Sequence, residues 1–256
     1  MRGRIDLNAD VGEGFGPWPM GADAELIPLV TSVNVACGAH AGDPVTMEAT
    51  VRLAVRHGVT VGAHPGYPDL AGFGRRDLDM TPDELAASLV YQIGALAAFV
   101  RDAGTELGHV KAHGALYNRA AADPGIAAVV ARAVVRVAPD AVLVGLAGSA
   151  LIDAGRAAGL RVAAEAFADR AYESDGSLRS RRLPGALLAT PELAAAQAVA
   201  IARKGRVVSW DGAEIAVDAD TICLHGDTPG AAAYAHAIRA ALGAAGIALE
   251  PLARAG

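Results

Sequence analysis

The chain has 256 residues, of which 53% are hydrophobic and 20% are charged, and its formal net charge is −6. A chain of this length and apolar content can bury one large core. The acidic balance argues against a nucleic-acid partner, because phosphate neutralisation needs clustered Lys and Arg. The sequence has no polybasic stretch and no uninterrupted apolar run of about 20 residues, so we expect no membrane association.

The first residues lead within a few positions into a strand-like segment, RIDLN. This start leaves no room for a signal peptide, and we therefore expect a cytoplasmic protein. The two cysteines, Cys37 and Cys223, have neither metal-finger spacing nor a disulfide framework. We interpret both as small buried strand-end residues rather than as reactive thiols.

Seven short β-type runs follow one another along the chain. They are residues 4–8, 32–36, 60–63, 109–111, 142–146, 160–163 and 221–224. Several are apolar on both faces, as expected for parallel strands covered by helices. The segment 206–218, centred on Asp211-Gly212 between alternating runs, predicts a β-hairpin insertion. Residues 247–250 are a candidate for a short eighth strand.

Five of the intervening helices are predicted to begin with a capping residue followed by proline. These pairs are Asp43-Pro44, Thr81-Pro82, Asp123-Pro124, Thr190-Pro191 and Thr228-Pro229. The capping side chain accepts from a free backbone N–H, and proline at the first helical position loses no hydrogen bond. Glu84 completes a capping box with Thr81. Gly58, Gly104 and Gly205 are predicted to end three helices.

The repeated strand–helix units show no break in composition, which predicts one α/β domain over residues 1–256. The favoured architecture is an irregular (β/α) barrel of about seven parallel strands. A doubly wound open sheet is the structural alternative. Its nucleotide-binding version is disfavoured, because no GxGxxG opens a helix after the first strand.

Six runs rich in polar residues and glycine each follow a short apolar stretch. They are residues 6–16, 34–44, 62–76, 110–118, 165–181 and 223–229. Because the carboxyl ends of parallel barrel strands meet at one rim, we expect these runs to gather there. The sequence therefore predicts an enzyme with its site on that rim.

Asp6, Asn8 and Asp10 alternate along the first strand and so share one face. Burying two carboxylates without partners would cost several kcal/mol, so we expect them to contact Lys, Arg, His or a metal ion. Lys111 lies two residues before His113 on another strand, and Asp6 and Asp10 are its natural partners. The alternative is a purely structural, hydrogen-bonded strand end.

His40, His64, His113 and His225 each lie at or just past a strand end in a different strand–helix unit. We expect at least two of them to line one pocket. They can act as general acids and bases near neutral pH, or as neutral ligands to a metal ion that activates water. No HxH or HExxH spacing supports the metal, so a site without metal is the preferred interpretation. If a metal is present, the expected ligands are Asp6, Asp10, His40 and His64.

The chain also places arginines in these runs, at positions 75, 76, 170 and 179. A guanidinium group can bind a carboxylate or a phosphate with two parallel hydrogen bonds. For Arg75 and Arg76, an ordinary solvated loop pair is the alternative interpretation.

The six runs, in this order, resemble the LamB/YcsF family over essentially the whole chain. The resemblance is carried by the combination of DLNADVGEGFG, NVACGAHAGDP, GAHPGYPDLAGFGRR, HGALYN, EAFADRAYESDG and HGDTPGA. One departure is Ala112, where the family usually has proline before HGALYN. The change removes no chemical group from the site.

The resemblance implies an irregular barrel related to the glycoside hydrolase and deacetylase-like barrels. It also implies ATP-dependent hydrolysis of 5-oxo-L-proline to L-glutamate by a 5-oxoprolinase, with this chain as its A component beside partner B and C components. The expected cosubstrate is ATP with Mg²⁺, bound either by this chain or by the rest of the complex. No organic prosthetic group is expected.

We assign the expected roles in two sets. The catalytic set, for proton transfer, water activation and contact with the carbonyl, is Asp10, Glu13, His64, Lys111 and His113. The substrate-binding set is Asp6, Asn8, Asn34, His40, Arg75, Arg170, His225 and Asp227. Two other functions stay open: a metal-dependent amide hydrolase or deacetylase that acts alone, and a substrate-binding component without chemistry of its own.

Overall fold

The computed structural model describes residues 3–228 and 230–252. Seven parallel strands follow one another around a barrel: β1 (Arg4–Val11), β2 (Ser32–Ala36), β3 (Thr60–His64), β4 (His109–Lys111), β5 (Val142–Leu146), β6 (Val162–Phe167) and β9 (Thr221–His225). Strand β9 pairs with β6 on one side and with β1 on the other, which closes the barrel. The predicted (β/α) barrel is confirmed, and the open-sheet alternative is wrong.

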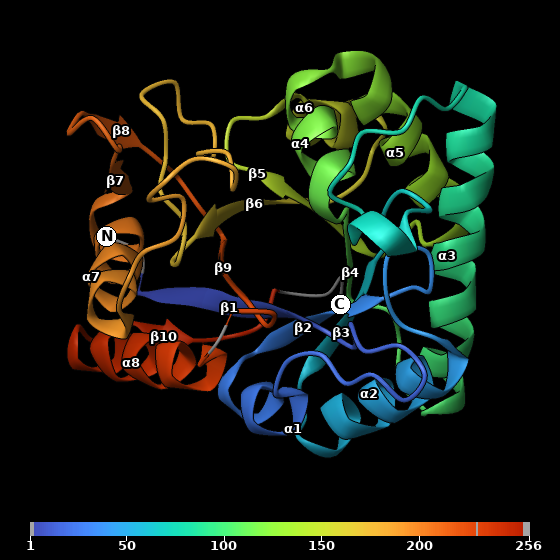
Figure 1. Ribbon diagram of the computed structural model, residues 1–256, viewed down its shortest axis with the longest axis horizontal. Coiled ribbons are helices and arrows are strands. Elements are labelled where there is room, and N and C mark those ends of the chain that lie inside the picture. Colours follow the sequence, from blue (N-terminus) through green and yellow to red (C-terminus); the bar gives the residue numbers. More distant parts are fainter. Residues whose placement is uncertain (1–2, 229, 253–256) are drawn as a thin grey trace.

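Helices surround the barrel (Figure 1). They are α2 (Pro44–Arg56), α3 (Pro82–Asp102), α4 (Gly114–Ala122), α5 (Pro124–Val137), α6 (Ala150–Ala157), α7 (Pro191–Lys204) and α8 (Ala231–Ala244). Between β1 and β2 the chain forms only α1 (Asp23–Leu26) and the 3-10 turn η1 (Ile27–Leu29), and a second turn, η2 (Leu70–Gly72), follows β3. This short first crossover makes the barrel irregular.

Four of the five predicted capped helix starts are confirmed, at α2, α3, α5 and α7, where the Asp or Thr side chain accepts from backbone N–H groups. Thr81 and Glu84 form the predicted capping box. At the fifth, α8 begins at Ala231 with Gly230 as its N-cap, and Pro229 lies outside the described residues.

Three small strands lie outside the barrel ring. Strands β7 (Arg206–Val208) and β8 (Glu214–Ala216) pair antiparallel around the Asp211-Gly212 turn. Strand β10 (Ala248–Leu249) pairs parallel with the first residues of β1. Two barrel strands run well past their expected ends, β1 to Val11 and β6 to Phe167. Their polar residues Asp10 and Glu165 continue the strands because both have a buried cationic partner inside the barrel.

The strands divide apolar from polar side chains between their two faces. Leu7, Ala9 and Val11 of β1 belong to the main hydrophobic core between strands and helices. Asp6, Asn8 and Asp10 alternate with them and point into the barrel, where they are buried. The barrel interior is therefore a column of polar groups, and its upper end meets the carboxyl ends of the strands.

Helix α3 is, in the part of the chain that the structure describes, the one helix long and apolar enough to cross a membrane by length and composition. Core helices pass the same test. Leu85, Leu89, Ile93 and Leu96 are buried in the core, where α3 packs against β3 and α5. The helix therefore serves as a wall of the barrel fold.

Gly62 on β3 sets the close packing of the barrel interior. A Cβ atom at this position would overlap the His109 ring, whose Nε2 lies 2.7 Å from Asn34 Oδ1. A Cβ atom added to Gly94 on α3 would have no other atom within 4 Å.

We predict that Gly62→Ala destabilises the fold by about 1–3 kcal/mol through overpacking, whereas Gly94→Ala stabilises it by up to about 1 kcal/mol through helix propensity. Urea unfolding of both variants checks the pair. Equal stability of Gly62→Ala and the wild type would contradict the interior packing described above.

Candidate active site

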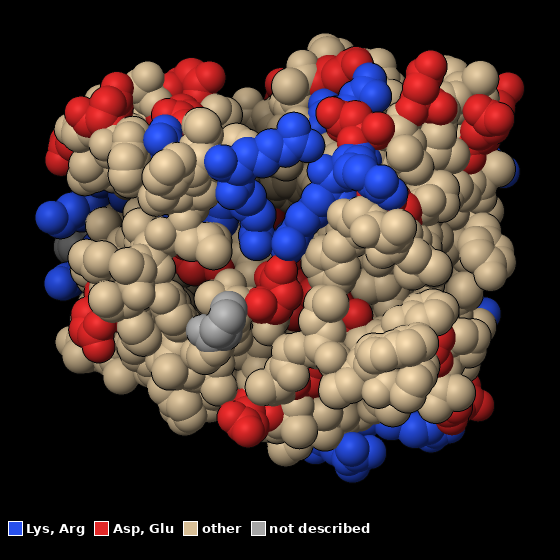
Figure 2. All heavy atoms as spheres, in the orientation of Figure 1, with Lys and Arg blue, Asp and Glu red and all other residues tan. Residues whose placement is uncertain are grey.

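A cavity of about 730 Å³ opens at the carboxyl ends of the barrel strands. Asp10, His64, Lys111, His113 and His225 form its floor and walls. Six arginines also line it: Arg75, Arg76, Arg119, Arg170, Arg181 and Arg182. Figure 2 shows blue side chains around the hollow with acidic groups at one edge. The site is therefore suited to a small anionic ligand.

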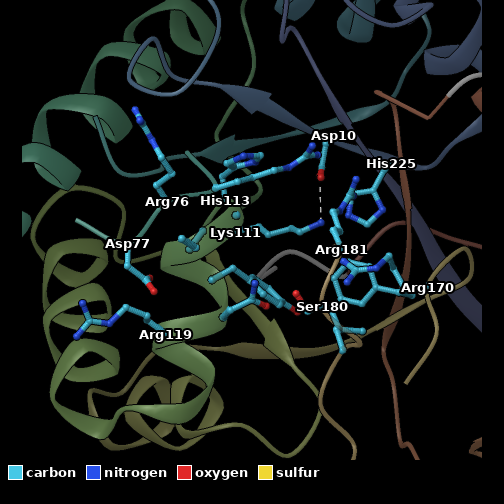
Figure 3. A pocket seen from close by; sticks show the side chains of 18 of the residues that line it. Asp10, Arg76, Asp77, Lys111, His113, Arg119, Arg170, Ser180, Arg181 and His225 are labelled. Carbon is cyan, nitrogen blue, oxygen red and sulfur yellow. Dashed lines mark hydrogen bonds and ion pairs between the residues drawn. The ribbon is translucent and has the colours of Figure 1, made fainter. Parts of the chain in front are cut away.

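Lys111 is the central charge of the site. Its Nζ lies 3.0 Å from Asp10 Oδ1, 2.9 Å from Glu165 Oε1 and 3.0 Å from Cys223 Sγ, and its side chain is 2% exposed. Figure 3 shows the Asp10 contact as a dashed line. Burial alone would lower the pKa of Lys111, but Asp10, Cys223 and Glu165 together raise it well above the ordinary value. The lysine is a buried cation with its donors engaged.

Asp10 is held ionised by this arrangement. Burial would raise its pKa, but His64 and Lys111 hold the pKa well below the ordinary value. Asn34 Nδ2 donates to Asp10 Oδ1 at 2.8 Å. The predicted Lys111–Asp10 contact is confirmed. The predicted Lys111–Asp6 contact is wrong, and Glu165 is the second carboxylate.

Two histidines form a chain along the cavity wall. His64 Nδ1 lies 2.8 Å from the Lys111 carbonyl oxygen, and His113 Nε2 lies 2.8 Å from the Phe73 carbonyl oxygen. The other two nitrogens, His64 Nε2 and His113 Nδ1, are 3.0 Å apart. Asp10 Oδ2 lies 3.4 Å from His64 Nε2.

His40 and Glu13 lie behind this wall. The His40 ring stacks on His113 with ring centroids 3.7 Å apart. Its Nε2 is 3.6 Å from Glu13 Oε1, which is 3.7 Å from His113 Nδ1. Burial lowers the pKa values of His40 and His113 well below the ordinary value, so both rings are neutral at neutral pH.

On the opposite side of the cavity, His225 pairs with a carboxylate. His225 Nδ1 lies 2.9 Å from Asp169 Oδ2, and the ring stacks on Phe167. Because a carboxylate can only accept, Nδ1 carries hydrogen, and in the tautomer with a single N–H the other nitrogen, Nε2, is the acceptor. An imidazole oriented in this way can act as a general base.

The rim arginines differ in how firmly they are held. Arg75 pairs with Asp227 and lies over the Phe73 ring, and Arg76 pairs with Asp69. Arg170 donates to two backbone carbonyls, of Ala186 and Arg179, and so also holds the loop that follows β6. Burial lowers the pKa of Arg170 to about 10.

The remaining predicted residues lie deeper in the barrel. Asn8 donates to Glu165 and Thr221, and accepts from Asn34. Asp6 accepts from the hydroxyl groups of Thr31, Ser32 and Thr221. It lines a second cavity at the amino ends of the strands. Four residues along a strand span roughly 13 Å, so the proposed ligand set of Asp6 with Asp10, His40 and His64 does not come together.

The structure places the predicted catalytic set, Asp10, Glu13, His64, Lys111 and His113, in one connected cluster. Their roles stay predictions. Sequence reasoning missed Glu165, Asp169 and Arg181. All three lie in the same polar run as Arg170, residues 165–181. The signal for Glu165 was its place on β6, two residues before Phe167 and so on the same face of the strand.

Both cysteines are free and buried. Burial raises the pKa of the Cys37 thiol to about 12, and burial also raises that of Cys223. Neither thiol has the lowered pKa of a reactive cysteine. Within residues 3–228 and 230–252, two groups of side chains could hold a metal ion: Glu13, His40, His64 and His113, or Asp10, Cys223 and His225.

The model of the LamB/YcsF family matches residues 5–256. The chain belongs to the LamB/YcsF family. A relative from Heliobacterium modesticaldum, named as the A component of 5-oxoprolinase, is 57% identical over 96% of this chain and 97% of its own length.

Two solved structures share the fold. The crystal structure of a lactam utilization protein from Thermus thermophilus has a TM-score of 0.92 at 47% identity, and covers 97% of this chain and 100% of its own. A T48 deacetylase with substrate has a TM-score of 0.51 at 14% identity, over 97% of this chain and 87% of its own, which shows the barrel fold alone.

Burial raises the pKa of Asp6 from 3.8 to about 6. Between these pH values the folded state binds more protons than the unfolded state, so Asp6 makes the fold less stable as the pH rises through this window. Between pH 4 and pH 7 this effect lowers the unfolding free energy of the wild type by an amount on the order of 3 kcal/mol, and we predict that Asp6→Asn abolishes this decrease. Unfolding free energies of the wild type and variant at both pH values measure this difference. Exposed Asp140→Asn is the control, and an Asp6→Asn variant with the pH dependence of the wild type would contradict the prediction.

Proposed function

We propose that this chain is the A component of a multi-component 5-oxoprolinase and takes part in ATP-dependent hydrolysis of 5-oxo-L-proline to L-glutamate. The observation that carries the proposal is the cavity at the barrel rim, in which cationic and acid–base groups surround one space. The names of the relative from Heliobacterium modesticaldum and of the protein from Thermus thermophilus support it.

The substrate is a small anionic lactam of about nine non-hydrogen atoms. The cavity volume lies within the range of about 300–1,000 Å³ that small-molecule sites have, so the lactam would leave room for a phosphoryl group. Arg170 and Arg181 reach the cavity from the loop after β6 (Figure 3). We assign the substrate carboxylate to these two side chains, because a guanidinium group binds a carboxylate with paired hydrogen bonds.

The lactam amide is unstrained and resists attack by water, and ATP supplies the driving force by phosphorylating its oxygen, which activates the carbonyl carbon. Water adds to this carbon, the ring C–N bond breaks as the nitrogen takes up a proton, and a second water hydrolyses the resulting acyl phosphate to glutamate and phosphate. The residues of this chain would move protons. His225 Nε2, oriented by Asp169, accepts a proton from the attacking water. Asp10 stays ionised beside Lys111, and its negative charge stabilises the positive charge that His225 gains with this proton.

Lys111 thereby acts through Asp10 as a positioning residue. Its ammonium group already contacts Asp10, Glu165 and Cys223. The sequence led us to expect a direct contact between Lys111 and the substrate carbonyl. In the proposal made here, Lys111 contacts Asp10 instead.

The decisive experiment is a glutamate-release assay with 5-oxoproline, run with and without ATP and with and without the partner B and C components. Glutamate release that needs ATP and all three components supports the proposal. Release by this chain alone without ATP would identify a stand-alone amide hydrolase instead. Binding of 5-oxoproline without any release in the full complex would identify a substrate-holding component.

We predict that Lys111→Met lowers the turnover of the reconstituted complex to about 1% or less. Without the cation, the pKa of Asp10 rises, so the acidic limb of the residual pH–rate profile moves to higher pH. The chain has one other lysine, the exposed Lys204, and Lys204→Met is the matched control. Unfolding curves report the folded fraction of each variant. Wild-type turnover of folded Lys111→Met would refute this role.

Asp169→Asn tests the orienting carboxylate. The amide keeps the shape but no longer fixes the His225 proton on Nδ1, so we predict a fall in turnover of about 10²–10⁴-fold. Affinity for 5-oxoproline should change much less, because Asp169 contacts His225 rather than the open cavity. Steady-state kinetics and equilibrium binding separate the two effects. Unchanged turnover would remove His225 from the proton-transfer role.

A further inference from the structure

We propose that Glu13, His40, His64 and His113 bind one divalent transition-metal ion of the zinc type, with one ligand atom from each side chain. This site lies beside the arginine-lined cavity and uses a different residue set from the one expected from sequence. The inference does not depend on the reaction proposed above.

The first step is the position of the imidazole protons. His64 Nδ1 and His113 Nε2 each contact a backbone carbonyl oxygen, of Lys111 and Phe73. A carbonyl can only accept, so both of these nitrogens carry hydrogen. In the tautomers with a single N–H, His64 Nε2 and His113 Nδ1 then present lone pairs to each other at 3.0 Å. Two lone pairs repel at this distance, and either a metal ion or a shared proton between them removes the repulsion.

The second step is the set of unpartnered atoms around this pair. Both ring nitrogens of His40 and the Oε1 atom of Glu13 are buried and have no hydrogen-bond partner among the described residues. His40 is 1% exposed and Glu13 is 5% exposed. A buried polar atom without a partner costs roughly 1–3 kcal/mol, so their joint presence at one point indicates a missing ligand.

The third step is geometry. The four ligand atoms lie within 4.8 Å of one another. The His40–Glu13 and His113–Glu13 separations of 3.6 Å and 3.7 Å are too long for hydrogen bonds. A tetrahedral zinc ion with ligands at about 2.0–2.1 Å has ligand–ligand edges of roughly 3.4 Å. The His64–His113 separation of 3.0 Å is shorter than this edge, and the two separations from Glu13 are slightly longer.

The fourth step is the chemistry of the four side chains. Three imidazoles and one carboxylate form a donor set that suits zinc.

The other candidate group, Asp10, Cys223 and His225, is disfavoured by charge. Lys111 Nζ lies 3.0 Å from both Asp10 Oδ1 and Cys223 Sγ. This ammonium satisfies both atoms and repels a second cation. Among the described residues, no lysine or arginine forms a hydrogen bond with the nitrogens of His40, His64 or His113.

The test measures metal binding by this chain alone, without ATP or the partner components, so its failure leaves the proposed reaction untouched. The purified chain is treated with a chelator, loaded with Zn²⁺ or Co²⁺, and freed of excess ion. Elemental analysis should then give one ion per chain, and bound Co²⁺ should give the intense visible absorption of a tetrahedral site. His40→Ala and His113→Ala should each weaken binding at least 100-fold, whereas the exposed His57→Ala should not change it.

X-ray absorption on the Zn²⁺-loaded wild type keeps the test decisive if a variant does not fold, since it should show only N and O ligands at about 2.0–2.1 Å. Failure of the wild type to retain a stoichiometric ion would overturn the proposal. Undiminished binding by folded His40→Ala and His113→Ala would also overturn it, because the ion would then lie elsewhere. A shared proton between His64 and His113, seen by nuclear magnetic resonance both before and after Zn²⁺ treatment, would identify a hydrogen bond in place of the metal.

Discussion

The barrel interior depends on one buried cation. Lys111 comes from β4, and its carboxylate partners Asp10 and Glu165 come from β1 and β6, which are not its neighbours in the sheet. The three charges therefore meet across the barrel rather than along one strand pair. Removing one partner from such a group leaves a buried charge uncompensated, which is strongly destabilising. The charge balance of the barrel interior and the ionisation of Asp10 thus rest on the same contact.

This constraint explains how a largely apolar chain keeps a polar centre. The outward faces of the strands and the helices supply the hydrophobic core, while the inward faces stack polar groups in layers. Asp6 binds hydroxyl groups at the lower end, Asn8 and Asn34 form the middle layer, and Asp10 reaches the cavity. Each layer supplies hydrogen bonds to the next, so the upper side chains are held by groups that never meet a ligand. The rim loops can then carry the arginines, because the core of the fold does not depend on those loops.

The sequence predicted much of this, because its signals are local. The capped proline starts fixed four helices, and the strand-end polar runs placed Asp10, His64 and Lys111 at one rim. The sequence could not show how deep in the barrel each side chain lies, or which side chains pair with each other. Alternation puts Asp6 and Asp10 on one face of β1 but does not say that the strand is long enough to carry them to different layers. Glu165 was missed as the partner of Lys111 because that pairing depends on which strands face each other across a closed barrel. The backbone carbonyls of Lys111 and Phe73 accept from one ring nitrogen of His64 and of His113, which turns the other two ring nitrogens toward each other. No sequence pattern marks such a contact.

The central claim is that Lys111 is a charged group buried between carboxylates. Since the chain has only two lysines, nuclear magnetic resonance of selectively labelled lysine side chains gives two resolvable signals, with exposed Lys204 as an internal reference. As the pH is raised through the range in which an ordinary lysine titrates, we expect the Lys111 signal to stay in its charged position. A Lys111 signal that titrates within or below that range, or that is already neutral near pH 7, would contradict the account.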